Sequence, residues 1–166
     1  MATHRVPIIT WAFVPNAAGV FFEPYPIKAT NDVWDRMVLI FNDTATRDGG
    51  AGGFTVPKNY VGTAKIIVVW TSTAVTGNVI WDFDYRAVGG DDTESLDQAG
   101  TQESVTVTDA APSAANERME ASMTLTAANL AVDDEVTFEL FRDGAAADTI
   151  AAAVIVFALL FEYSDA

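Results

Sequence analysis

The sequence predicts an all-β protein, an antiparallel β-sandwich of the jelly-roll type with about eight strands. Short segments rich in β-branched and aromatic residues recur along the chain, and Gly, Pro, Asn and Asp separate them. No long amphipathic helical pattern interrupts these segments. The 166 residues suit one domain over residues 1–166, with residues 1–16 as an extended arm or an edge strand.

The clearest strands form a hairpin of residues 64–73 and 78–88. The second strand alternates between the apolar Val79, Trp81, Phe83 and Tyr85 and the charged Asp82, Asp84 and Arg86. This period of two predicts one face in the core and one in water. The other expected strands are residues 6–13, 19–28, 36–42, 103–108, 118–126, 135–142 and 151–163. We expect a glycine-rich loop at residues 48–53 and an exposed acidic loop at residues 89–101.

The last expected strand is apolar at both parities. One face would carry Val154, Val156, Ala158 and Leu160, and the other Ile155, Phe157, Leu159 and Phe161. A sandwich strand needs one apolar face, so a second one left in water would promote association. We expect a neighbouring subunit, or else a loop of the same chain, to cover it. The predicted interface comprises Trp11, Phe13, Ile155, Phe157, Leu159 and Phe161.

Charge excludes several classes of partner. The chain has 9 basic and 23 acidic residues, a net charge of -14, which disfavours binding to nucleic acid or to anionic membranes. We see no secretion signal at the N-terminus, and the apolar stretch 150–161 is shorter than the roughly 20 residues of a spanning helix. The absence of cysteine excludes disulfides and thiolate metal sites.

Catalytic residues are not expected. The only histidine, His4, lies near the chain end, and no nucleophile-elbow, zinc-protease or phosphate-loop motif is present. Asp82 and Asp84 project from one strand face about 7 Å apart, a spacing compatible with glycoside hydrolysis. A solvated outer face is the favoured interpretation of this pair, and a hydrolase is kept only as a third hypothesis.

Bound metal and bound sugar are weaker alternatives. Acidic residues cluster in two loops, Asp91, Asp92, Glu94 and Asp97 in the first and Asp133, Asp134 and Glu135 in the second. Such loops suit calcium, but the EF-hand spacing is absent and solvated acidic loops are common, so we expect no metal or cofactor. Trp34, Tyr60 and Trp70 are possible sugar platforms, although Trp in a sandwich is more often part of the core.

A turn joins the last two expected strands. Asp143-Gly144 is a turn signal, and Asp148-Thr149 can bond the backbone at the entry to the next strand. We predict a charge-assisted clasp of Arg142 with Asp143 and Asp148 that holds this connection.

The segment ELFRDGAAADTI (139–150), preceded by AVDDEVTF (131–138), resembles a pattern of tailed-bacteriophage virion proteins. VPKNY (56–60), IIVVWT (66–71) and VIW (79–81) are also similar to that group. The resemblance implies a jelly-roll module, commonly a trimer, that serves as a capsid decoration protein or an appendage head. No catalytic residue carries over with it, and the N-terminal third has no match.

The main hypothesis is therefore a non-enzymatic virion protein, a trimeric decoration (cement) protein that stabilises a phage head. Its partners would be copies of itself and the major capsid protein. It would be made in the host cytoplasm and sit on the particle surface. The alternative is a receptor- or glycan-binding head of a phage tail fibre that uses exposed loops such as residues 89–101.

Overall fold

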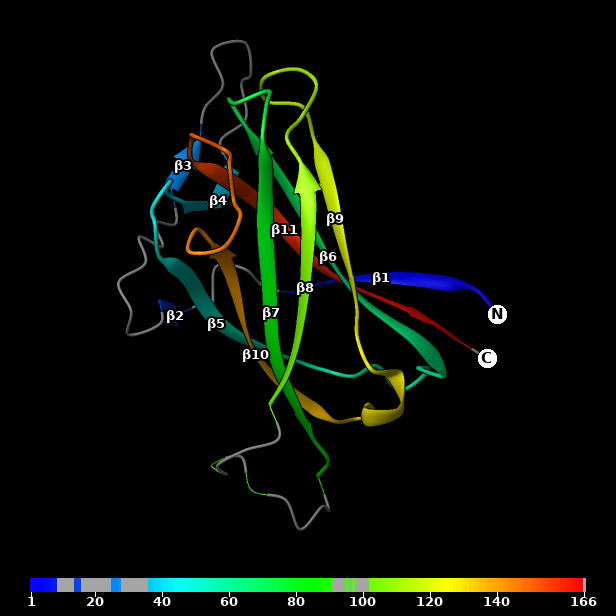
Figure 1. The fold of residues 1–166 in the computed structure, drawn as a ribbon. Coiled ribbons are helices and arrows are strands. Elements are labelled where there is room, and N and C mark those ends of the chain that lie inside the picture. The colour runs from blue at the N-terminus through cyan, green and yellow to red at the C-terminus, as the bar shows by residue number, and fades with distance from the viewer. Residues whose placement is uncertain are drawn as a thin grey trace.

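The computed structural model describes residues 1–8, 14–15, 25–27, 36–90, 95, 97 and 102–165, and these form a two-layer β-sandwich (Figure 1). One layer is a six-stranded sheet of β1 (Thr3–Ile8), β3 (Tyr25–Ile27), β4 (Arg36–Phe41), β6 (Gly62–Ser72), β9 (Met119–Thr124) and β11 (Val154–Ser164). The other is a five-stranded sheet of β2 (Val14–Pro15), β5 (Arg47–Thr55), β7 (Asn78–Val88), β8 (Glu103–Ala110) and β10 (Glu135–Asp143).

The strand order confirms the predicted antiparallel sandwich. The six-stranded sheet runs β3-β4-β11-β6-β9, with β1 also paired to β11, and the five-stranded sheet runs β2-β5-β10-β7-β8. Every pair is antiparallel. The sole helical element among the described residues is a single 3-10 turn, Ala127–Asn129. In the same part of the chain, no helix is long and apolar enough to cross a membrane.

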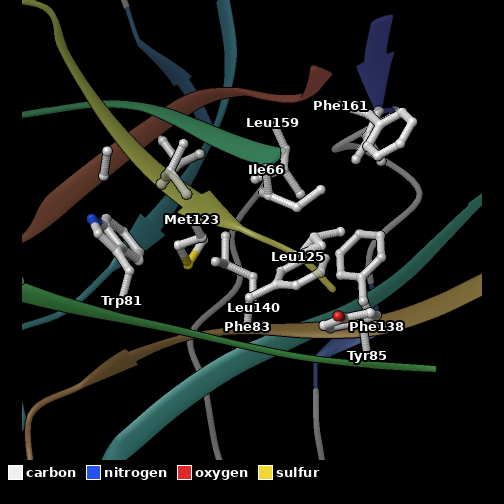
Figure 2. Packing of buried hydrophobic residues seen from close by; sticks show 14 of the residues in the cluster. Ile66, Trp81, Phe83, Tyr85, Met123, Leu125, Phe138, Leu140, Leu159 and Phe161 are labelled. Carbon is white, nitrogen blue, oxygen red and sulfur yellow. The ribbon is translucent and has the colours of Figure 1, made fainter. Parts of the chain in front are cut away.

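Aromatic rings fill the space between the sheets (Figure 2). Trp81, Phe83 and Tyr85 of β7 face this core, as their alternation predicts. Phe83 stacks on Phe138 of β10 with ring centroids 4.9 Å apart, and Trp70 of β6 meets Trp81 edge-on at 6.2 Å. The Trp70–Trp81 pair connects the two layers, whereas Phe83 and Phe138 belong to the same sheet. Ring pairs of both kinds contribute beyond the area they bury.

The glycine-rich segment is a strand and not the predicted loop. β5 pairs with β10 along its whole length, from Arg47 opposite Asp143 to Thr55 opposite Glu135. Gly49 is needed because the neighbouring strand fills the space beside it: a Cβ added at Gly49 would lie 2.2 Å from Cδ1 of Phe141. Glycine in a strand marks such a close approach.

The last strand contains a bulge that the sequence analysis did not predict. Val156 pairs with Trp70 while Ala158 pairs with Val69, so Phe157 is an extra residue. After this extra residue, the odd-numbered side chains face the core in place of the even-numbered ones, so Leu159 joins Val154 and Val156 in the core. The prediction that Leu159 and Phe161 share a face with Ile155 and Phe157 is therefore wrong.

The two chain ends lie side by side (Figure 1). β1 pairs with the second half of β11, from Thr3 opposite Ser164 to Ile8 opposite Leu159. Residues 1–16 were predicted to be either an extended arm or an edge strand, and residues 3–8 form a strand paired to β11. Trp11 and Phe13, predicted at an interface, lie outside the described residues.

Candidate functional site

A groove of about 610 Å³ lies on the outer face of the five-stranded sheet. Described residues from β5, β7 and β10, and the residue just before β8, line it. They are Ala51, Gly52, Gly53, Asp84, Tyr85, Arg86, Gln102, Glu135, Thr137, Phe138 and Glu139.

The groove exists because β5 has almost no side chains beside β10. Gly53 lies opposite Thr137 and Ala51 lies opposite Glu139 in the register of these strands. Side chains from β10 and β7 rise from the sheet, while the backbone of β5 stays low. A ligand can therefore approach the backbone at this point, a use to which proteins often put glycine.

Three carboxylates, those of Asp84, Glu135 and Glu139, line the groove. The Glu135 carboxylate accepts a hydrogen bond from the Thr55 hydroxyl at 3.1 Å. Glu139 lies between Ala51 and Asp84 in the sheet register and is half-buried. Within the described part of the chain, no hydrogen bond or ion pair to the Glu139 carboxylate occurs, and this residue lines the groove.

Beside the groove, Arg47 joins two carboxylates of β7. Its Nε lies 2.9 Å from Asp82 and its Nη2 lies 2.6 Å from Asp84, while its guanidinium covers the Phe141 ring at 3.6 Å. Burial lowers the pKa of Arg47, but the hydrogen bonds to Asp84 and Asp82 outweigh burial and raise that pKa above its ordinary value. The network fixes the position of Asp84 in the groove wall.

Hydroxyls of β8 complete the contacts of this carboxylate pair. Thr106 donates to Asp82 at 2.6 Å and Ser104 donates to Asp84 at 2.5 Å. The predicted solvated face is therefore wrong, because both carboxylates are buried and each of their four oxygens has a partner. Two carboxylates on one strand that share one guanidinium do not flank a bond to be cleaved, which argues against the hydrolase hypothesis.

Tyr85 forms the inner side of the same wall. Its hydroxyl donates to Glu103 at 2.7 Å and accepts from the Thr126 amide at 2.9 Å. Burial raises the pKa of Tyr85 above its ordinary value, so the phenol keeps its proton for Glu103. The aromatic part of Tyr85 belongs to the core, and the tyrosine is a rigid support for the groove.

The predicted contact between Arg142 and Asp148 is present. Arg142 is buried and donates Nε and Nη2 to the two Asp148 oxygens, each at 2.9 Å. It also donates to the carbonyls of Ile150 at 2.6 Å and Ala152 at 2.8 Å. The predicted role of Asp143 in this clasp is wrong, because its carboxylate accepts from the amides of residues 145 and 146 in the turn.

The four described residues of the predicted interface separate into two pairs. Leu159 and Phe161 are in the core of the chain itself, at 0% and 1% exposure, which removes them from any interface. Ile155 and Phe157 are half-buried on the outer side of β11. Strict alternation placed all four residues on one face, because the bulge at Phe157 has no clear signal in the sequence.

The described residues hold no group of three or more His, Cys, Asp and Glu side chains that suits a metal. Asp134 is used within its own turn, where it accepts from the Ala131 amide at 2.7 Å. His4 bonds Asp165 at 2.7 Å and stacks on Tyr163, so it ties the two chain ends together. Asp91, Asp92 and Glu94 lie outside the described residues.

Of the predicted aromatic platforms, Trp70 and Tyr60 are buried in the core, and Trp34 lies outside the described residues. The groove residues Arg86, Gln102, Thr137 and Glu139 were not predicted from the sequence as part of a binding site. Polar residues that alternate with apolar ones are typical of any solvent-exposed sheet face, so their pattern did not indicate a binding site. The groove could have been located from the segment GGAGG (49–53), had this segment been interpreted as a strand without large side chains.

Solved structures provide the comparison, because no family model and no curated protein matches the chain. A family 22 xylan-binding domain of Xyn10C from Paenibacillus barcinonensis aligns with a TM-score of 0.52 and 11% identity, over 99% of this chain and 94% of that domain. A family 43 arabinoxylan arabinofuranohydrolase from Bacillus subtilis, solved with cellotetraose, aligns with a TM-score of 0.50 and 14% identity. The alignment covers 97% of this chain but only 27% of that enzyme. At these identities the likeness shows a shared β-sandwich fold.

Proposed function

We propose that this chain is a non-catalytic carbohydrate-binding β-sandwich and that its groove holds a short stretch of a glycan chain. The observation that carries the proposal is the glycine-floored groove, which has polar side chains on the two neighbouring strands β7 and β10. Its volume of about 610 Å³ lies in the range of small-ligand sites. The fold shared with a xylan-binding domain over nearly its full length supports the same conclusion.

The lining suits a polyhydroxylated ligand. Carboxylates of Asp84 and Glu139 accept hydrogen bonds, and Arg86, Thr137 and Gln102 can donate them. A sugar ring carries hydroxyls that both donate and accept, so it can satisfy this mixed set. Hydrogen bonds to charged groups are the stronger ones, and they fix the orientation of the ring.

Isothermal titration against neutral polysaccharides and oligosaccharides tests the proposal. Xylan, mannan and soluble cellulose derivatives form the first panel. We expect saturable binding that the Ala51→Trp variant abolishes, because its indole would fill the groove. Ser122→Trp is the matched control, since Ser122 is exposed on β9 of the other sheet. Absence of binding to every glycan, or full binding by Ala51→Trp, contradicts the proposal.

A glycan-binding head of a phage tail fibre is a more specific form of this function. Adsorption assays on host cells, competed with the soluble protein, test that form. The capsid decoration role, with a homotrimer bound to the major capsid protein, is a separate prediction. The half-buried Ile155 and Phe157 on the outside of β11 are consistent with it. Light scattering on the purified protein measures its molar mass in solution, and a stable monomer at micromolar concentration would contradict the trimer.

A further inference from the structure

The groove carries an excess of negative charge. Its described lining residues include the three carboxylates Asp84, Glu135 and Glu139, and among them Arg86 is the only cation. The whole chain has a net charge of -14, so no distant surplus of positive charge compensates the groove.

The three carboxylates differ in what already occupies them. Asp84 has Arg47 on one oxygen and Ser104 on the other. One oxygen of Glu135 is engaged by Thr55. Glu139 has neither an ion pair nor a hydrogen bond with any described residue, and it lies on the central strand of the groove. Among the three, the Glu139 carboxylate is therefore the one that has no described hydrogen-bond partner to compete with a ligand.

The neighbours of Glu139 increase its effect on a ligand. Across β7 the directly opposite residue is Asp84, and across β5 it is Ala51, which has no polar side chain. Arg47 is committed to Asp82 and Asp84, so it does not neutralise Glu139. A ligand lying over Ala51 would contact a carboxylate that is only partly exposed to water, and charges interact more strongly there than in bulk solvent.

We propose that the groove selects neutral glycans over acidic ones and that Glu139 determines this selection. The inference rests on the proposed glycan-binding function and names its ligand class. The two Glu139 oxygens accept charge-assisted hydrogen bonds from adjacent hydroxyls of a neutral sugar. The same carboxylate repels a uronic acid at that position, so specificity arises from attraction and repulsion together.

The test compares matched pairs of tetrasaccharides by isothermal titration. One pair is xylotetraose with and without a glucuronic acid branch, and the other is cellotetraose with and without C6 oxidised to carboxylate. For the natural chain we expect the neutral member of a bound pair to bind at least about tenfold more tightly. Raising the salt concentration should narrow the difference, because salt screens the repulsion.

Glu139→Gln removes the charge and keeps the shape. We expect about tenfold weaker binding of the neutral sugar, since a neutral hydrogen bond replaces a charge-assisted one. We also expect the preference for the neutral sugar to shrink severalfold. Glu120→Gln is the matched control, because Glu120 lies on β9 of the other sheet, and it should match the natural chain. Thermal unfolding of each variant verifies that it is folded.

The outcomes separate the two proposals. Failure to bind any of the four sugars counts against the glycan-binding function itself. Binding of a neutral sugar with equal or tighter binding of its acidic partner overturns the selectivity and leaves the function standing. Unchanged binding and unchanged preference in Glu139→Gln overturn the role of Glu139.

Discussion

The guanidinium carbon of Arg47 lies 3.6 Å from the centre of the Phe141 ring, on the outside of the five-stranded sheet. A phenylalanine on an outer sheet face would ordinarily be exposed, yet Phe141 is 3% exposed. Gly49 leaves room for the ring on one side, and Arg47 covers it on the other. One arginine thus shields an aromatic ring and forms ion pairs with two carboxylates of β7.

Replacing Arg47 with Met should destabilise the chain by about 2 kcal/mol, because Asp82 and Asp84 then remain buried without a counter-ion. Urea denaturation measures this loss. The matched control is Arg118→Met, since Arg118 is 62% exposed and should cost less than about 1 kcal/mol. Equal losses in the two variants would show that the Arg47 network contributes nothing special.

Gly49→Ala should destabilise the chain by about 1 to 3 kcal/mol through overpacking. The new Cβ would lie 2.2 Å from Cδ1 of Phe141 and 2.7 Å from the carbonyl oxygen of Leu140, and a backbone oxygen cannot move freely. Gly90→Ala is the control, because nothing lies within 4 Å of a Cβ there. Differential scanning calorimetry should show a lower Tm for the first variant alone.

Arg142→Met should cost about 3 to 5 kcal/mol, because the buried Asp148 loses its counter-ion and keeps only backbone amide donors such as that of Ile150. The carbonyls of Ile150 and Ala152 lose a donor in the same variant. Asp148→Asn keeps those carbonyl contacts, so we expect a smaller loss. Urea denaturation of both variants and of their combination separates the effects. A larger loss for Asp148→Asn than for Arg142→Met would contradict this account.

Sequence patterns predicted the strands that have one apolar face. The hairpin strand 78–88 has the bounds of β7, because its alternation is regular and its core partners are aromatic. The face of the strand was predicted correctly, but the burial of Asp82 and Asp84 was not. That burial depends on Arg47, which lies 35 residues before Asp82. Contacts of this range leave no local signal.

β5 and β11 show the physical reasons for the two main errors. A run of glycines has low strand propensity, and its pairing depends on Phe141 from another strand, so the segment reads as a loop. In β11 both faces of the strand are apolar. The bulge at Phe157 changes which of the following residues face the core, and an apolar sequence on both faces gives no sign of this change. The groove follows from the first of these features, so the sequence analysis missed it together with the strand.

The bulge leads to a distinct prediction for neighbouring residues. Leu159→Ala should destabilise the chain by about 2 to 5 kcal/mol, because Leu159 is fully buried between the sheets. Ala substitution of Leu160, which is half-buried on the other face, should cost clearly less. Guanidinium denaturation compares the two. If Leu160→Ala were the more harmful change, the strand would lack the bulge.

The attachment of β1 should depend on pH. Arg5 of β1 donates a hydrogen bond from Nε to the Glu162 carboxylate at 2.8 Å, and this bond lowers the pKa of Glu162 below its ordinary value of 4.5, against the opposing effect of burial. A carboxylate with a lowered folded-state pKa stabilises the fold above its unfolded pKa and loses this contribution as pH falls through the folded value. The contribution should therefore be complete at neutral pH and decline below about pH 4.5.

Thermal unfolding of the natural chain and of Arg5→Ala from pH 7 to pH 3 measures this dependence. At neutral pH we expect Arg5→Ala to be less stable by about 1 kcal/mol or less, since Arg5 is 44% exposed and the pair is partly screened. The gap should narrow as acid protonates Glu162 and Glu120, which Arg5 also contacts, because the natural chain then loses the interactions that the variant already lacks. Lys58→Ala, which removes an exposed charge that has no ion pair with a described residue, should show no such trend. A gap that stays constant down to pH 3 would mean that Glu162 does not hold β1 through its charge.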